Sequence, residues 1–132
     1  MKTLQWTSLF LTIVLITGIA EANYNTPSDS GKQNYLMAIK SDNQGLILSS
    51  MMNIIKLKAL APSTELGKIQ TIINEFSTEH SDVTIRYCAR LATEVFADPQ
   101  WFANVKVVST NDIIEFYRIV AKRLDEKVFV CK

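Results

Sequence analysis

The feature that most constrains the fold is a helical stretch, residues 35–61, that is apolar on almost every side. Its polar positions recur at spacings of seven, four and three residues, which places them on one narrow stripe of a helix. They are Asp42, Ser49, Asn53 and Lys56. A helix with so little polar surface lies in the middle of a bundle or against a partner. Gly45 weakens this helix and Pro62 ends it.

Local start signals divide the rest of the chain into further helices. Ser63 or Thr64 is the predicted N-cap of a second helix, and Ser81-Asp82 opens a third. Asp98-Pro99 begins a short fourth element, because proline is favoured at the first position of a helix. The segment 109–112 resembles a capping box and precedes the last helix. These start signals, with short loops between them, predict an all-α fold, a small bundle of four to five antiparallel helices.

The first 22 residues have the pattern of a cleavable secretory signal peptide. Lys2 supplies a positive start, residues 9–16 are apolar, and Ala20-Glu21-Ala22 is an A-x-A cleavage site. The apolar run is too short to cross a bilayer, which takes about 18 residues. We therefore predict a secreted, extracellular protein with no membrane span after signal removal. Residues 23–34 are polar and are predicted to be a flexible lead-in to a single helical domain at 35–132.

Two cysteines, Cys88 and Cys131, lie in the mature part of the chain. An even number of cysteines in an oxidising compartment favours a disulfide. A bridge within the chain would close a loop of about 43 residues, which is worth on the order of 4 kcal/mol in the chain-entropy model. An intermolecular bridge or free thiols are the alternatives.

Charge and residue content argue against nucleic-acid binding and against catalysis. The 14 basic and 13 acidic residues are interspersed and leave a net charge of +1, so no basic stripe is available for a nucleic acid. The only histidine, His80, lies in a polar loop beside Ser81 and Asp82, which we interpret as solvated rather than catalytic. One histidine and two distant cysteines do not make a zinc site. We predict no enzyme activity, no cofactor and no metal.

Two features are candidates for binding. Trp101 and Phe102 are adjacent on one element and cannot both face the same core line, so one is a candidate contact for another protein. Packing of both under a loop is the alternative. Met51, Met52 and Ile55 are candidates to line a cavity for a hydrophobic small molecule, to form a homodimer seam, or to fill the core.

The leading functional hypothesis from these features is a secreted, non-enzymatic protein that binds another extracellular protein at its helical surface. A carrier of a hydrophobic small molecule in the bundle interior is the alternative. A hydrolase that uses His80 is a third hypothesis, and it requires that histidine to be buried beside a serine and a carboxylate.

Overall fold

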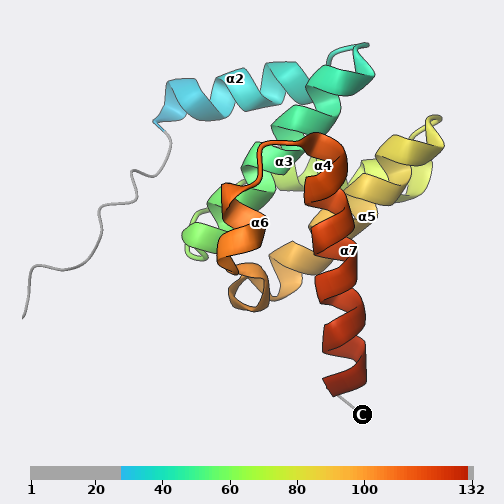
Figure 1. Cartoon of the computed structure of the whole chain (residues 1–132). Helices are drawn as coiled ribbons and strands as arrows, with labels where there is room; N and C mark the ends of the chain where they lie inside the picture. The colour runs from blue at the N-terminus through green and yellow to red at the C-terminus, as the bar shows by residue number, and fades with distance from the viewer. Residues whose placement is uncertain (1–27, 131–132) are drawn as a thin grey trace, which may run out of the picture.

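The computed structural model describes residues 28–130, and over this range the chain is helical, without strands (Figure 1). The elements are α2 (Asp29–Ile39), α3 (Gln44–Leu60), α4 (Lys68–Glu79), α5 (Val83–Ala97), the 3-10 helix η1 (Pro99–Phe102), α6 (Val105–Ser109) and α7 (Ile113–Val130). The predicted all-α fold is confirmed, with six α-helices in the described range instead of four to five. The predicted signal peptide and Cys131 lie outside the described residues.

The predicted long helix over 35–61 is in fact two helices, α2 and α3, joined by a turn at 40–43. Asn43 caps the second helix, because its side-chain oxygen accepts a hydrogen bond from the Leu46 N–H at 3.0 Å. Such a cap satisfies a backbone donor that the preceding helix cannot reach, so the helix restarts there. The weakening predicted at Gly45 is therefore a complete break between two helices, and it lies just before that residue.

The predicted flexible lead-in at 23–34 is wrong for its second half, because α2 begins at Asp29. The Ser28 hydroxyl accepts a hydrogen bond from the Gly31 N–H at 3.3 Å and caps the helix. Further along α2, Leu36 packs against the core and Ile39 is fully buried. Tertiary packing thus stabilises a helix whose own sequence is mostly polar.

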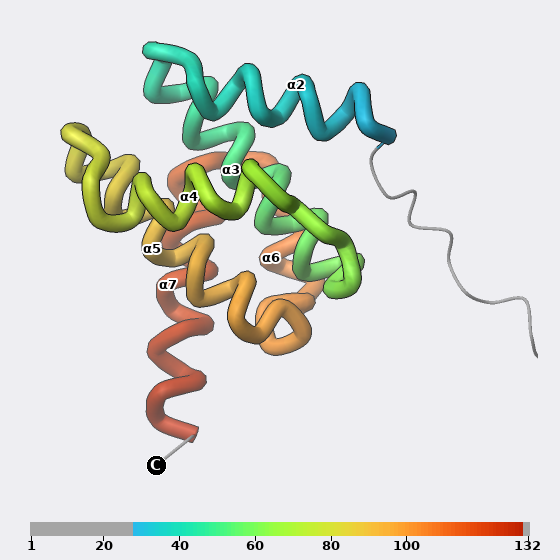
Figure 2. The backbone as a smooth tube through the Cα atoms, turned by 180° about the vertical axis from the view of Figure 1, so that it is seen from behind, coloured from blue at the N-terminus to red at the C-terminus, as the bar shows by residue number. Residues whose placement is uncertain are grey.

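The central position predicted for the apolar helix is confirmed for α3. It contacts α2, α5, α6, α7 and η1 (Figure 1; Figure 2 shows the same arrangement from behind). Its residues Met51, Ile54 and Ile55 are completely buried, in one core with residues of every other α-helix. A helix that other helices cover on most sides exposes little surface to water, so most of its positions are apolar.

Lys56, predicted on the polar stripe, is in fact only 9% exposed. Its ammonium donates to the Thr110 carbonyl oxygen and, at 3.1 Å, to the side-chain oxygen of Asn111. It also lies 5.7 Å from the centre of the Phe116 ring. Burial lowers the pKa of Lys56 because desolvation disfavours the charged form. The lysine therefore ties α3 to the turn before α7.

The N-cap predicted at Ser81-Asp82 is confirmed, and two others are wrong. Asp82 accepts a hydrogen bond from the Ile85 N–H at 3.0 Å. A capping box at 109–112 would make Ser109 the N-cap of α7, whereas Asp112 is the cap and accepts a hydrogen bond from the Glu115 N–H at 2.8 Å. The N-cap of α4 is Gly67, without a side-chain cap, instead of Ser63 or Thr64. The loop before it wraps around Lys58, whose ammonium donates to the carbonyl oxygens of residues 62 and 64 at 2.7 Å each. These two bonds join Lys58 to carbonyl groups four and six residues further along the chain, and they tie the loop back to the end of α3.

Candidate functional site

An open apolar groove of about 320 Å³ runs between α5 and α7. Its floor is made by Leu48, Cys88 and Tyr117, of which the last two are 4% and 6% exposed. Its rim carries Tyr87 and Ile114, which are 54% and 82% exposed. The groove exists because α5 and α7 each bury one stripe against α3 and leave the adjoining apolar residues uncovered.

The polar groups on the groove floor are not reactive. The Tyr117 hydroxyl donates to the Leu48 carbonyl oxygen at 2.9 Å, which fixes α7 on α3. Burial raises the pKa of the Cys88 thiol to about 11 and raises the pKa of Tyr117 well above its ordinary value. Both groups are therefore protonated at neutral pH, and a protonated thiol is a poor nucleophile. The floor is chemically an apolar surface.

Arg118 closes one edge of the groove and carries its charge. Its Nε and Nη2 donate to the two carboxylate oxygens of Glu115 at 2.8 and 2.6 Å. The hydrogen bonds from Arg118 lower the pKa of Glu115. Tyrosine, arginine and large aliphatic side chains around an apolar depression are typical of protein-binding surfaces.

The structure does not bring Trp101 or Phe102 into this groove. Phe102 is completely buried, so its side chain is not accessible to a partner. Trp101 is half-buried, and its indole N–H donates to the Arg123 carbonyl oxygen at 3.0 Å. The Arg123 Nε donates back to the Trp101 carbonyl oxygen at 3.0 Å, and its guanidinium lies 4.3 Å from the ring centre. These contacts hold η1 against α7.

Met51, Met52 and Ile55 belong to the core, with exposed fractions of 0%, 5% and 0%. None of the four pockets described among residues 28–130 is lined by them. Their side chains pack with those of the surrounding helices in a single cluster. The structure therefore offers no observation in favour of a ligand cavity at these three residues.

His80 has a structural role at the start of α5. Its Nδ1 accepts a hydrogen bond from the Asp82 N–H at 3.0 Å, and its ring packs edge-on against Phe76 with the centroids 4.7 Å apart. The nearby Ser77 hydroxyl donates to the Asn74 carbonyl oxygen at 2.6 Å instead of to the histidine. A catalytic triad requires the serine to donate to the histidine, so these contacts do not form one.

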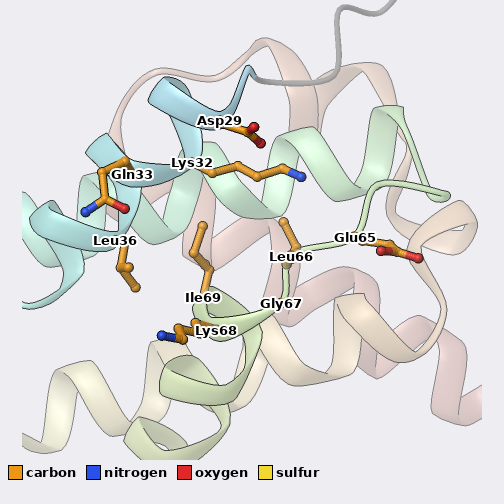
Figure 3. A pocket seen from close by; sticks show the side chains of 9 residues that line it. All are labelled: Asp29, Lys32, Gln33, Leu36, Glu65, Leu66, Gly67, Lys68 and Ile69. Carbon is orange, nitrogen blue, oxygen red and sulfur yellow. The ribbon is translucent and has the colours of Figure 1, made fainter.

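A second pocket, of about 380 Å³, lies between α2 and the start of α4 (Figure 3). Charges of both signs surround it, with Asp29 and Glu65 as well as Lys32 and Lys68 in its walls. Leu36 and Ile69 supply its apolar part. This mixture selects no ligand class, since neither an anion nor a cation would meet a consistent field.

Cys88 forms no disulfide with another described residue. Cys131, the partner predicted for Cys88, lies outside the described residues, so the bridge between them stays a prediction.

Within residues 28–130 no group of three metal-ligating side chains comes together. Among the helices described, none is long and apolar enough to cross a membrane. Comparisons with protein-family models, with curated proteins and with solved structures find no match to this chain.

Sequence reasoning missed the groove, although a signal for it was present. Ile85, Cys88 and Ala89 mark the buried stripe of α5, and Tyr87 falls outside that stripe. Ile114 likewise falls beside the buried residues of α7. Apolar residues left over from a helix's buried stripe are the residues to examine first for a binding surface.

Proposed function

We propose that the protein is a small secreted, non-enzymatic protein that acts by binding another protein in the groove between α5 and α7. The observation that carries the proposal is the exposure of Ile114 and Tyr87, 82% and 54%, on the rim of an apolar groove. Covering these side chains with a partner removes apolar surface from water, at about 25 cal/mol per Å². The signal-like segment at 1–22 is the support for secretion.

The secretion part of the proposal is tested by expressing the full chain in a eukaryotic secretory host. The expected result is a released protein whose N-terminal residue is Asn23. An Ile13→Arg variant, which breaks the apolar run, is expected to stay inside the cell. Release of the variant in normal amounts, or retention of the unaltered protein, would overturn this part.

The binding part is tested with a photo-crosslinking amino acid at position 87 or 114 of the released protein, placed in the fluid into which it is secreted. A matched control carries the same group at Met37, which is 66% exposed on α2 and lies outside the groove. We expect one discrete adduct from positions 87 and 114 and none from position 37, with the joined protein identified by mass spectrometry. Equal labelling from all three positions, or none, contradicts the proposed surface.

A separate experiment tests the alternative function, a carrier of a hydrophobic small molecule. Binding of a fluorescent fatty acid that a Met51→Ala variant weakens and an Ile114→Glu variant leaves unchanged would favour the interior carrier over the groove. The bridge between Cys88 and Cys131 remains part of the proposal, and mass spectrometry of the released protein before and after reduction tests it, since a bridged monomer is two hydrogens lighter than its reduced form.

A further inference from the structure

The outward stripe of α7 has a regular pattern of apolar and charged residues. Ile114, Arg118, Ala121, Asp125 and Val128 follow one another at spacings of four, three, four and three. That spacing keeps them on one face of a helix and is the spacing of helix-pairing seams. Ile114 and Val128 are 82% and 52% exposed, Arg118 and Asp125 are exposed, and Ala121 is half-buried on the groove wall.

The order of residue types along this stripe is nearly symmetric about Ala121, except that the two charged residues have opposite signs. Ala121 stands at the centre, an arginine and an aspartate flank it, and an isoleucine and a valine stand outside them. If two such helices cross antiparallel at Ala121, Ile114 of each copy lies opposite the partner's Val128. Arg118 is three residues before Ala121 and Asp125 is four after it, so Arg118 of each copy lies within one residue, about 1.5 Å along the axis, of the position opposite the partner's Asp125. A two-fold symmetric interface requires this reciprocity, in which residue i meets j and j meets i.

The surroundings of the stripe are compatible with this packing. The last turns of α7 extend away from the other helices (Figures 1 and 2), and Val128, Phe129 and Val130 there are 52–75% exposed. The small side chain of Ala121 allows a second helix to approach closely at the crossing point. The groove that holds Tyr87 adjoins Ile114, at the end that the partner's Val128 reaches.

We infer that the partner held by this surface is a second copy of the chain, with the two α7 helices antiparallel and crossing at Ala121. The inference rests on the proposed function for the location of the binding surface. The arrangement closes as a symmetric pair, because each copy uses the same patch and no complementary surface is left over. The Arg118–Glu115 pair stays intact at the edge of the seam, where the partner's Asp125 joins it.

The first test is sedimentation equilibrium of the released protein over a concentration series, in reducing buffer so that no disulfide joins the copies. The weight-average mass is expected to rise with concentration towards twice the monomer mass. An Ile114→Glu variant is expected to raise the dimer Kd at least about tenfold, because it places a charge in the apolar seam. The matched control Met37→Glu, on the exposed side of α2, is expected to leave the Kd unchanged.

A charge exchange tests the antiparallel register. Arg118→Asp alone or Asp125→Arg alone puts like charges opposite each other in both symmetry-related pairs, and each is expected to raise the Kd about tenfold. The double variant R118D/D125R restores opposite charges and is expected to return the Kd to within about threefold. The two residues are seven apart on α7, about 10 Å along the axis, so no bond within one chain explains the rescue.

The outcomes separate this inference from the proposed function. A protein that stays monomeric, while position 114 still crosslinks to a different protein, overturns the second copy and leaves the groove as a binding surface. Monomers together with no position-specific crosslink overturn both. A dimer that Ile114→Glu does not weaken, or that the double charge exchange does not restore, overturns the α7 seam.

Discussion

Replacing Arg123 by methionine is expected to lower the free energy of unfolding by about 2 kcal/mol. The variant loses the hydrogen bond from Nε to the Trp101 carbonyl oxygen and the stacking of the guanidinium on the Trp101 ring. A hydrogen bond from a charged donor is worth about 1.5–3 kcal/mol, and an exposed cation–π contact about 0.5–1 kcal/mol. The Arg123 side chain is 31% exposed, so we take the lower end of each range.

The Glu126 carboxylate, 3.1 Å from the Arg123 guanidinium, adds little to this estimate. Its side chain is 47% exposed, and ion pairs of that kind are worth about 0–1 kcal/mol. Methionine keeps an apolar stem against the indole ring, so the change in packing is small. The expected loss is therefore that of the polar contacts between η1 and α7.

Urea unfolding followed by circular dichroism measures this loss. For a protein of this size an m-value of about 1–3 kcal/mol/M makes the midpoint fall by about 1 M. Trp101 is the only tryptophan after residue 22, so its emission in the released protein reports the same contact and is expected to shift to longer wavelength. The control is Lys122→Met, at an exposed neighbouring position, which is expected to stay within about 0.5 kcal/mol.

The reasoning would be refuted if Arg123→Met cost less than about 0.5 kcal/mol, or no more than Lys122→Met. Either result would show that the contacts of Trp101 with Arg123 do not stabilise the fold. Trp101 would then again be a candidate contact for another protein.

Three further predictions concern single residues. The Cys88 thiol, whose pKa burial raises to about 11, is expected to resist iodoacetamide at pH 8 in the folded protein and to react in urea, and equal labelling rates in the two states would contradict its burial. Gly67→Ala is expected to lower the free energy of unfolding in urea by about 1–3 kcal/mol, because φ +53° with ψ −123° lies outside the regions open to residues with a Cβ. No heavy atom lies within 4 Å of an added Cβ, so the cost is one of backbone strain alone, and a neutral result would contradict it. Asp82→Ala is expected to cost about 1 kcal/mol through loss of the helix cap. The Ile85 N–H lowers the pKa of Asp82 below 3.8, so the stability from this carboxylate is present above that pH and is lost as the pH falls through the lowered value. The difference in free energy of unfolding between the unaltered protein and Asp82→Ala is therefore expected to become smaller in acid. Urea titration at several pH values measures it, and a difference that grows in acid would contradict the cap.

Helix ends with local signals could be predicted from the sequence. Asp82 caps its helix as expected, and α3 ends just before Pro62. These signals succeed because an N-cap hydrogen bond joins residues three apart, and because a proline has no N–H to continue a helix and disfavours helical geometry at the residue before it. The apolar surround of α3 also predicted its central place, since a helix with no wide polar face has to be covered.

Where a local preference competed with packing, the sequence was a poor guide. Thr64 is a good capping residue, yet α4 begins at Lys68 with Gly67 as its N-cap, and the Thr64 carbonyl oxygen instead accepts a hydrogen bond from the Lys58 ammonium. The polar segment at 29–34 is helical because α2 packs on α3 further along. Propensity is worth a few tenths of a kcal/mol per residue, which a few tertiary contacts outweigh.

What the sequence by itself determined is the all-α class, the central helix and the helix starts with side-chain caps, all of which depend on residues within a turn or two of each other. Only the tertiary structure decided which apolar side chains remain exposed, so that Phe102 is buried and Ile114 is not. The bonds that decide it join distant positions: Lys56 to the Thr110 carbonyl, and Tyr117 to the Leu48 carbonyl, 69 residues away. Burial depends on which helix lies over which, and a periodic pattern shows a face of a helix without showing what covers it.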